Sequence, residues 1–459
     1  MSRIGSFLFA ELCAIIFTKL NLASILFLAE ARIINTFYDR LHKEFLINEQ
    51  LIETMKIACT SCQPYFQKIK ESVENNQLKI LRAFQQNRIT DFHLNGSTGY
   101  GYGDEGRDKL EKVYATIFKA EKALVRAQIV SGTHAISLGL FGNLQNGDEL
   151  IVATGRPYDT LLKVIGTQGE EGSLRQYGID YREIPLLKEQ EIDLEQVCSS
   201  ISGKTKMVFF QRSKGYQWRT SFKIADLARA IKSVKDRFPH VICMVDNCYG
   251  EFVEAQEPIE AGADLIAGSL IKNPGGGLAL TGGYLAGKEE LINKAALRLT
   301  APGIDLEVGS SLNFNRPAYQ GLFIAPLIVG EALQGAVLAA KFFKLLGYPV
   351  LPQYDEERTD IIQAINLGSR ELMLSFCQGL QKACPLDAYV KPEAALLPGY
   401  VDEVVMAGGT FIQGSSIELS ADGPIRPPYN IYLQGGLSLG QIKTGLLLAA
   451  EEMRKTKSA

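Results

Sequence analysis

The sequence predicts an α/β fold with a large domain on a mainly parallel sheet and a smaller α+β domain at the carboxyl end. Short apolar strands alternate with helices from about residue 125, and a long apolar helix separates this region from a mixed C-terminal segment. Alternation on this scale is typical of parallel sheets, whose strands need crossover connections. With 459 residues, the chain is also too long for one hydrophobic core.

The expected elements follow in chain order. Apolar residues at helical spacing predict a helix over residues 47–87, and a glycine-rich stretch (95–103) and a helix (107–119) come next. Strands are expected at 123–130, 149–153, 180–184, 205–211, 241–245, 264–268 and 283–286. The helices expected among them are 133–141, 158–165 and 224–238. The C-terminal segment is expected to hold strands near 401–406, 409–412 and 415–419, between helices at 325–346 and 438–454.

These elements predict a division into four parts. They are a hydrophobic extension (1–45), a helical arm (46–94), a large domain (95–330) and a small domain (331–459). Within the extension, residues 6–29 are strongly apolar, but Glu11 and Lys19 interrupt the run, and charges are costly inside a bilayer. A non-catalytic extension is the favoured interpretation, and a membrane anchor is the alternative.

Composition excludes some classes of protein. Lys and Arg number 48 against 51 Asp and Glu, so the chain lacks the basic surface that broad nucleic-acid binding needs. The eight cysteines are scattered, unlike a secreted disulfide framework, and indicate a reduced, cytoplasmic protein. Cys59 and Cys62 form a CxxC pair, but no second ligand pair at zinc-binding spacing accompanies it.

Lys272 and Asp246 are the strongest candidates for chemistry. Lys272 lies between an apolar strand and a glycine run, and a buried lysine amine can condense with an aldehyde. Asp246 ends an apolar strand 26 residues earlier, where a carboxylate can pair with a protonated pyridine nitrogen. One helix and one strand are expected between them, which brings both to the same edge of the sheet. Taken singly, each has an ordinary alternative, a loop lysine or a helix cap.

Two further segments suggest a bound phosphate and a planar ring. Gly132 and Thr133 open a helix, and helix N-termini bind phosphate through free N–H groups. His134 follows them and either packs on a ring or caps the helix. Tyr158 comes after the next strand and could stack on a planar cofactor. Ordinary capping and turn roles are the alternatives for these residues.

Together these residues resemble the fold-type I enzymes that use pyridoxal 5′-phosphate (PLP), specifically the cystathionine/methionine γ-lyase group. Within it, the resemblance is to the branch known as aluminium resistance or methionine γ-lyase-like proteins, and it covers about residue 50 to the end. The runs that carry it are Gly96–Asp104 with Gly106 and Arg107, Ser131–Ala135, Val245–Glu251, Ser269–Gly277 and Asp422–Tyr429.

The resemblance implies a role for each matching residue. Lys272 would hold PLP as a Schiff base and act as general base, Asp246 would pair with the pyridinium, and Tyr158 would stack on the ring. Gly132, Thr133, His134 and Ser269 would bind the cofactor, mainly through its phosphate.

Two further roles follow from the resemblance. Tyr100 and Tyr102 would reach the phosphate of the neighbouring subunit, which implies a homodimer with shared active sites and a homotetramer as the larger assembly. The group has Tyr-x-Arg where this chain has Tyr-x-Tyr. Arg426 is the choice for binding the substrate carboxylate, since a guanidinium matches it bidentately, and Arg212 is the alternative.

The activity implied is a PLP-dependent carbon–sulfur lyase acting on a methionine- or cystathionine-type amino acid. Lys272 would remove the α-proton, and β- or γ-elimination would give a 2-oxo acid, ammonia and a thiol. Two alternatives remain, because a fold does not determine an activity. One is an aminotransferase or desulfurase on the same fold, and the other is a membrane-tethered stress-related protein with a vestigial PLP site.

Overall fold

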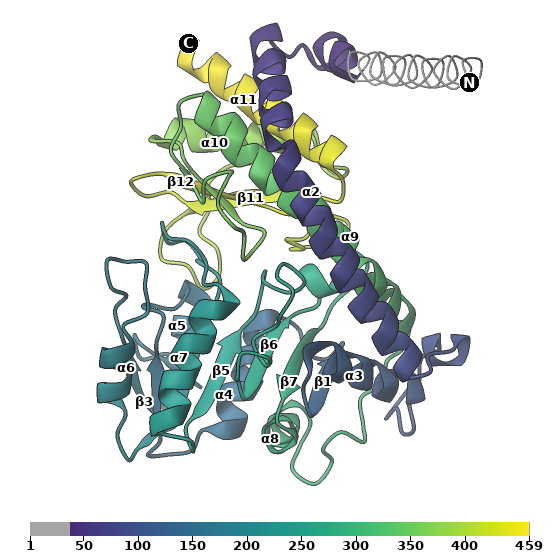
Figure 1. Cartoon of the computed structure of the whole chain (residues 1–459), viewed down its shortest axis with the longest axis vertical. Coiled ribbons are helices and arrows are strands. Elements are labelled where there is room, and N and C mark those ends of the chain that lie inside the picture. The colour runs from purple at the N-terminus through teal and green to yellow at the C-terminus, as the bar shows by residue number, and fades with distance from the viewer. Residues whose placement is uncertain (1–36, 459) are drawn as a thin grey trace, which may run out of the picture.

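The computed structural model describes residues 37–458, and the apolar run at 6–29 lies outside them. Two sheets, one in each half of the molecule, are joined by long helices (Figure 1). The larger sheet contains β1 (Lys122–Arg126), β2 (Glu149–Val152), β3 (Asp180–Glu183), β4 (Thr205–Gln211), β5 (Ile242–Asp246), β6 (Leu265–Ser269) and β7 (Gly283–Gly287).

The large sheet confirms the predicted mainly parallel α/β fold. Its strand order is β1-β7-β6-β5-β4-β2-β3, and among these seven strands β7 alone runs in the opposite direction to the others. All seven expected strands are present. β1 ends at Arg126, before residue 130, because Ile129 already donates its N–H to the Arg126 carbonyl in a turn toward the next helix.

Helices cover both faces of this sheet and make three layers. One face packs against α3 (Glu105–Phe118), α6 (Leu194–Ser200) and α7 (Ile224–Arg237). The other packs against α4 (Gly132–Asn143), α5 (Asp159–Ile165) and α8 (Glu289–Leu299). The helix expected at 133–141 is α4, which begins one residue earlier, at Gly132. The Ser131 side chain caps it by accepting the His134 N–H.

The smaller sheet is antiparallel, in the order β10-β11-β12-β9-β8. Its strands are β8 (Val350–Leu351), β9 (Gln363–Asn366), β10 (Val404–Ala407), β11 (Ser420–Pro424) and β12 (Asn430–Gln434), and α10 (Arg370–Gln381) and α11 (Leu439–Ser458) pack against it.

The strands expected at 409–412 and 415–419 are wrong, because these residues form turns. The Glu418 carboxylate accepts the backbone N–H groups of Phe411 and Ile412, at 2.9 and 3.0 Å. A side chain thus satisfies donors that a strand partner would otherwise take. Ile417 and Leu419 are nonetheless buried, which explains why their apolar pattern resembled a strand.

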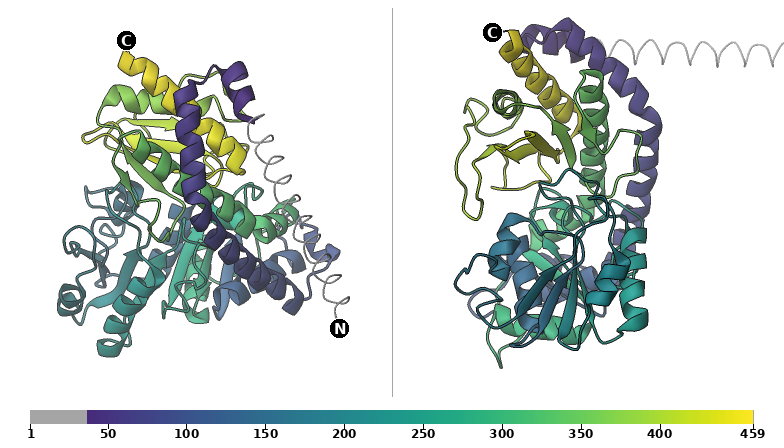
Figure 2. Two further views of the ribbon diagram at one scale, coloured as in Figure 1. Left: turned by 45° about the horizontal axis from the view of Figure 1, so that its top comes forward. Right: turned by 90° about the vertical axis from the view of Figure 1, so that its left-hand side faces the viewer.

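Two long helices, α2 (Glu49–Gln86) and α9 (Asn315–Leu345), run side by side from one half of the molecule to the other (Figures 1 and 2). α9 begins at Asn315, well before the expected residue 325. By length and composition it could cross a membrane, but 72% of its apolar window is buried, as in the core helix of a soluble protein.

Each of the two helices contains a proline, and the two prolines lie at different levels of the pair. Pro64 of α2 lies near Val337 of α9 along the pair, because the thiol of Cys62, two residues before Pro64, contacts the Val337 carbonyl at 3.8 Å. The level of Pro326 in α9 is marked by Phe323, whose carbonyl accepts a hydrogen bond from Gln77 at 2.9 Å. Each proline therefore lies level with a stretch of the other helix that has no proline.

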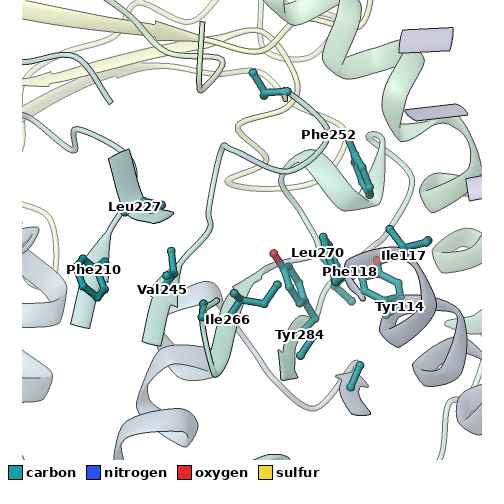
Figure 3. Packing of buried hydrophobic residues seen from close by; sticks show 14 of the residues in the cluster. Tyr114, Ile117, Phe118, Phe210, Leu227, Val245, Phe252, Ile266, Leu270 and Tyr284 are labelled. Carbon is teal, nitrogen blue, oxygen red and sulfur yellow. The ribbon is translucent and has the colours of Figure 1, made fainter. Parts of the chain in front are cut away.

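An aromatic stack joins the large sheet to α3 (Figure 3). The Phe118 ring stacks on Tyr284 of β7, with centroids 5.1 Å apart and 9° between planes, and on Phe252 at 6.0 Å. The Tyr284 hydroxyl donates to the Glu251 carboxyl at 2.9 Å. Glu251 is thereby held in the apolar interior, with no exposed surface.

Glu251 should make the folded state pH-dependent. Burial, together with nearby Glu257, raises the pKa of Glu251 to about 8, above its ordinary value of 4.5. Its stabilising contribution is therefore full below about pH 4.5 and is lost as the pH rises through 8, at up to about 1.4 kcal/mol per pH unit. Glu251→Gln, which stays neutral, should melt at increasingly higher temperatures than the parent as the pH rises from 5 to 8.

Thermal unfolding of the ligand-free proteins across this pH range checks the prediction. Glu290→Gln, at an exposed ion pair with Lys294, serves as the control and should track the parent. A difference in melting temperature between the parent and Glu251→Gln that stays constant from pH 5 to 8 would contradict a buried, neutral Glu251.

Candidate active site

A cavity of about 680 Å³ lies between the two sheets and takes its lining from both. It opens at the carboxyl ends of β2, β4, β5 and β6, where open α/β sheets usually bind ligands. Of the predicted site residues, it brings together Gly132, Thr133, Tyr158, Asp246, Ser269, Lys272 and Arg426.

Lys272 lies three residues beyond β6, at the start of a short 3₁₀ turn (Asn273–Gly275). Its ammonium nitrogen is 3.9 Å from the centroid of the Tyr249 ring, a cation–π contact. The neighbouring Asn273 side chain donates to the carbonyls of Tyr249 and Glu251, both at 3.0 Å, and fixes the turn. The lysine is therefore held toward the cavity by the two segments that flank it.

Asp246 is the last residue of β5, next to β6 in the sheet. The expected helix between Asp246 and Lys272 is wrong, because turns and β6 fill this interval. The two residues still reach the same edge, since β5 and β6 are parallel neighbours. Burial raises the pKa of Asp246, and the Lys272 ammonium opposes this shift. Burial lowers the pKa of Lys272. Cys248, Tyr249 and Asp246 together raise it by more than burial lowers it, so the pKa lies above its ordinary value.

The N-terminus of α4 forms a cradle beside these residues. A Cβ on Gly132 would lie 3.2 Å from the Cys248 sulfur and 3.3 Å from the Ser269 Cβ, so glycine keeps this space open. Free N–H groups and the helix dipole favour an anion at such a position, and Ser269 adds a hydroxyl. The donor set fits the phosphate of PLP.

Tyr158 forms a further wall of the cavity at the start of α5. Its hydroxyl lies 3.2 Å from the Thr133 hydroxyl, and its backbone N–H donates to the Gln211 side chain at 3.0 Å. Burial raises the pKa of Tyr158, so its phenol is neutral at physiological pH. A neutral ring at this position fits stacking on a planar cofactor.

Four predicted residues lie off the cavity of their own chain, and three of them are Tyr100, Tyr102 and His134. Tyr100 and Tyr102 are 73% and 69% exposed, with ring centroids 5.6 Å apart. His134 is half-buried, and its ring accepts the Val130 N–H at 3.2 Å, which is a capping arrangement. None of the three is among the lining residues.

The two candidate arginines are placed differently. Arg212 is fully buried, where it donates to Asn247 at 2.7 Å and pairs with Glu254 at 2.5 Å. It does not line the cavity, because both arms of its guanidinium are bound behind the site. Arg426 does line the cavity, at its rim, where it pairs with Asp402 at 2.8 Å and is half-exposed.

Apart from Arg426, sequence reasoning missed the part of the cavity that the small domain contributes. Asp422 of β11 and Tyr432 of β12 line it, together with the loop residues Tyr216 and Tyr400. Asp422 could have been noticed as an acidic residue within a buried strand, since its neighbours Ala421 and Gly423 are buried. The loop tyrosines follow no pattern that would have indicated them.

Comparison with known proteins confirms the resemblance to the methionine γ-lyase group. The family model described as methionine gamma-lyase matches residues 51–454. An uncharacterised protein of Bacillus subtilis is 51% identical over 84% of this chain and 92% of its own length. The crystal structure of a candidate cystathionine beta-lyase involved in aluminium resistance from Clostridium acetobutylicum has a TM-score of 0.88, with 47% identity over 90% of this chain and 98% of that one.

Two further structures extend the comparison. A carbon–sulfur lyase involved in aluminium resistance from Clostridium novyi has a TM-score of 0.87, with 46% identity over 90% of this chain and 98% of that one. The PLP-dependent protein YhfS of Escherichia coli, at 18% identity and a TM-score of 0.56, covers 84% of this chain and 97% of its own and shares the fold. This chain belongs to the methionine gamma-lyase family and has the fold-type I architecture of PLP-dependent enzymes.

Proposed function

We propose that this protein is a PLP-dependent carbon–sulfur lyase that converts a methionine- or cystathionine-type amino acid into a 2-oxo acid, ammonia and a thiol. The observation that carries the proposal is that Lys272, Asp246 and the N-terminus of α4 open onto one cavity. Membership of the methionine gamma-lyase family supports the same chemistry.

PLP, when bound, supplies an aldehyde that condenses with amines and a ring that accepts the electrons of an α-carbanion. Lys272 would hold the aldehyde carbon until the amine of the substrate replaces it there, and would then take the α-proton of the substrate on its freed amine nitrogen. Asp246 would keep the pyridine nitrogen protonated, and Tyr158 would cover one face of the ring. Gly132, Thr133 and Ser269 would hold the phosphate.

Arg426 is proposed to bind the substrate carboxylate. It is the one of the two candidate arginines that lines the cavity, and its partner Asp402 lies at the same rim. A guanidinium in this place can exchange an exposed carboxylate partner for that of an incoming amino acid at small cost, because exposed ion pairs contribute little. Arg426 would then orient the α-carbon toward Lys272.

A substrate panel on the PLP-loaded protein tests the proposal. We expect cystathionine or methionine to yield 2-oxo acid, ammonia and thiol in equal amounts, and the thiol from cystathionine distinguishes β-elimination (homocysteine) from γ-elimination (cysteine). Formation of a 2-oxo acid only with an added 2-oxo acid acceptor, and no thiol, would indicate an aminotransferase. Sulfur transfer from cysteine would indicate a desulfurase, and no turnover on the whole panel would contradict the proposal.

We also propose that the protein forms a homodimer or homotetramer and is cytoplasmic. Tyr100 and Tyr102 are exposed and away from the cavity of their own chain, as expected of residues that complete a neighbouring subunit's site in a homodimer or homotetramer. The seven cysteines within the described residues are free, which supports a reducing, cytoplasmic setting.

A further inference from the structure

The small-domain side of the cavity contains a carboxylate surrounded by aromatic rings. Asp422 accepts a hydrogen bond from the Tyr216 hydroxyl at 2.8 Å. The Tyr216 ring lies 5.3 Å from that of Tyr432 and 5.9 Å from that of Tyr400, centroid to centroid. All four side chains line the cavity, and none is among the groups proposed to hold PLP.

The charge of Asp422 has no ion-pair partner within the described part of the chain. The ion pairs there include Arg426 with Asp402 but none at Asp422. Burial raises the pKa of Asp422 to about 6, so the carboxyl is mostly ionised at neutral pH. An ionised carboxylate in a cavity wall that also contains three tyrosine rings is a chemical environment that attracts a cation, because the charge favours it and aromatic rings can add to the attraction.

Lys272 lowers the pKa of Asp422, although the two residues form no ion pair within residues 37–458. Lys272 has its own carboxylate, Asp246, on the large-domain side, and its ammonium lies over Tyr249. Asp422 is held instead by Tyr216, whose hydroxyl bonds one of the two carboxylate oxygens. A group entering the cavity from the small-domain side would therefore meet Asp422.

We propose that Asp422, with the rings of Tyr216, Tyr400 and Tyr432, is a subsite for a positively charged group on the sulfur-linked end of the substrate. The inference rests on the proposed lyase function and makes it more specific. The preferred substrate class is a sulfur amino acid whose leaving thiol carries an ammonium group, rather than a neutral thioether such as methionine.

Two pairs of ligands test this subsite. S-(2-aminoethyl)-L-cysteine and S-propyl-L-cysteine have side chains of equal length and share the α-amino and α-carboxyl groups. Their ratio of kcat/KM therefore compares a distal ammonium with a methyl group, and the effect of the variant on that ratio separates the subsite from the different leaving abilities of the two thiols. L-lysine and L-2-aminoheptanoate form the same comparison without a sulfur to eliminate. Their binding can be followed by the fluorescence of Trp218, the single tryptophan of the chain, which lies two residues from Tyr216.

We expect the parent protein to favour the ammonium member of each pair by about tenfold or more, the range of a charge-assisted contact. Asp422→Asn keeps the acceptor for Tyr216 and should bring both ratios close to one by weakening only the ammonium ligand. Asp402→Asn removes a carboxylate at the same cavity that is already paired with Arg426, and it should keep the ratios of the parent.

Each outcome decides the proposal. Ratios near one in the parent overturn it without any variant, so poor folding of a variant cannot mask a failure. An equal loss for both members of a pair in Asp422→Asn overturns it too, since that would place Asp422 with Lys272 rather than with the ligand. A binding preference for lysine without thiol release from the cysteine pair would leave the subsite standing and defeat the lyase function instead.

Discussion

Replacing Lys272 with alanine should lower turnover of a sulfur amino acid by at least about 10³-fold, because the change removes both the amine that would hold PLP and the base that would take the α-proton. The variant should also lose the absorbance band of lysine-bound PLP. Borohydride reduction of the parent protein, followed by peptide mapping, should place the pyridoxyl label on Lys272.

Lys214 is the informative control, since it is the other lysine in the cavity lining. Burial lowers the pKa of Lys214 to about 8, which favours a reactive neutral amine. Its nitrogen, however, donates to the carbonyls of Leu351 and Ile362, at 3.4 Å each, and so is directed to the small domain. In Lys214→Met the label should stay on Lys272. A label on Lys214 in the parent would contradict the assignment.

Replacing Arg212 with methionine should destabilise the protein by about 3–5 kcal/mol, the usual cost of leaving one partner of a buried ion pair alone. Arg212 bonds Asn247, directly after Asp246, and Glu254, whose carboxylate also accepts the Ile224 N–H at the start of α7. Its loss would leave Glu254 without a counter-ion. Urea unfolding of the parent and the variant measures the difference.

Arg426→Met is the matched comparison for Arg212. At the exposed pair with Asp402 it should barely change stability, but KM for the amino acid should rise about tenfold or more if Arg426 binds the substrate carboxylate. An Arg212→Met variant that folds with parental stability and shows the higher KM would reverse the two assignments.

The large domain could be predicted because its signals are local. Apart from β3, the parallel strands are short apolar runs. Asp246 ends one of them and Lys272 follows another, so the order of the elements was enough to place both at one edge. The small domain was harder, because Glu418 replaces strand pairing with side-chain bonds and thereby hides the true position of β11.

Except for Arg426, the small-domain part of the site was missed for a related reason. The contact between Tyr216 and Asp422 joins residues 206 positions apart, and it forms only because the two sheets meet at the cavity. Likewise, the ion pair that removes Arg212 from the site depends on Glu254, 42 residues later. Such pairings depend on tertiary packing, which no local pattern encodes.

The staggered prolines of α2 and α9 bear on how the enzyme can move. A proline removes one backbone hydrogen bond and is the usual place for a helix to bend. Pro64 and Pro326 lie at different levels, so the site at which one helix could bend packs beside a stretch of the other helix that has no proline. The helix pair should therefore resist bending and keep the two sides of the cavity at a constant distance from each other. Substrate entry would then depend on the rim loops, such as those carrying Tyr400 and Arg426, and not on the two domains moving apart.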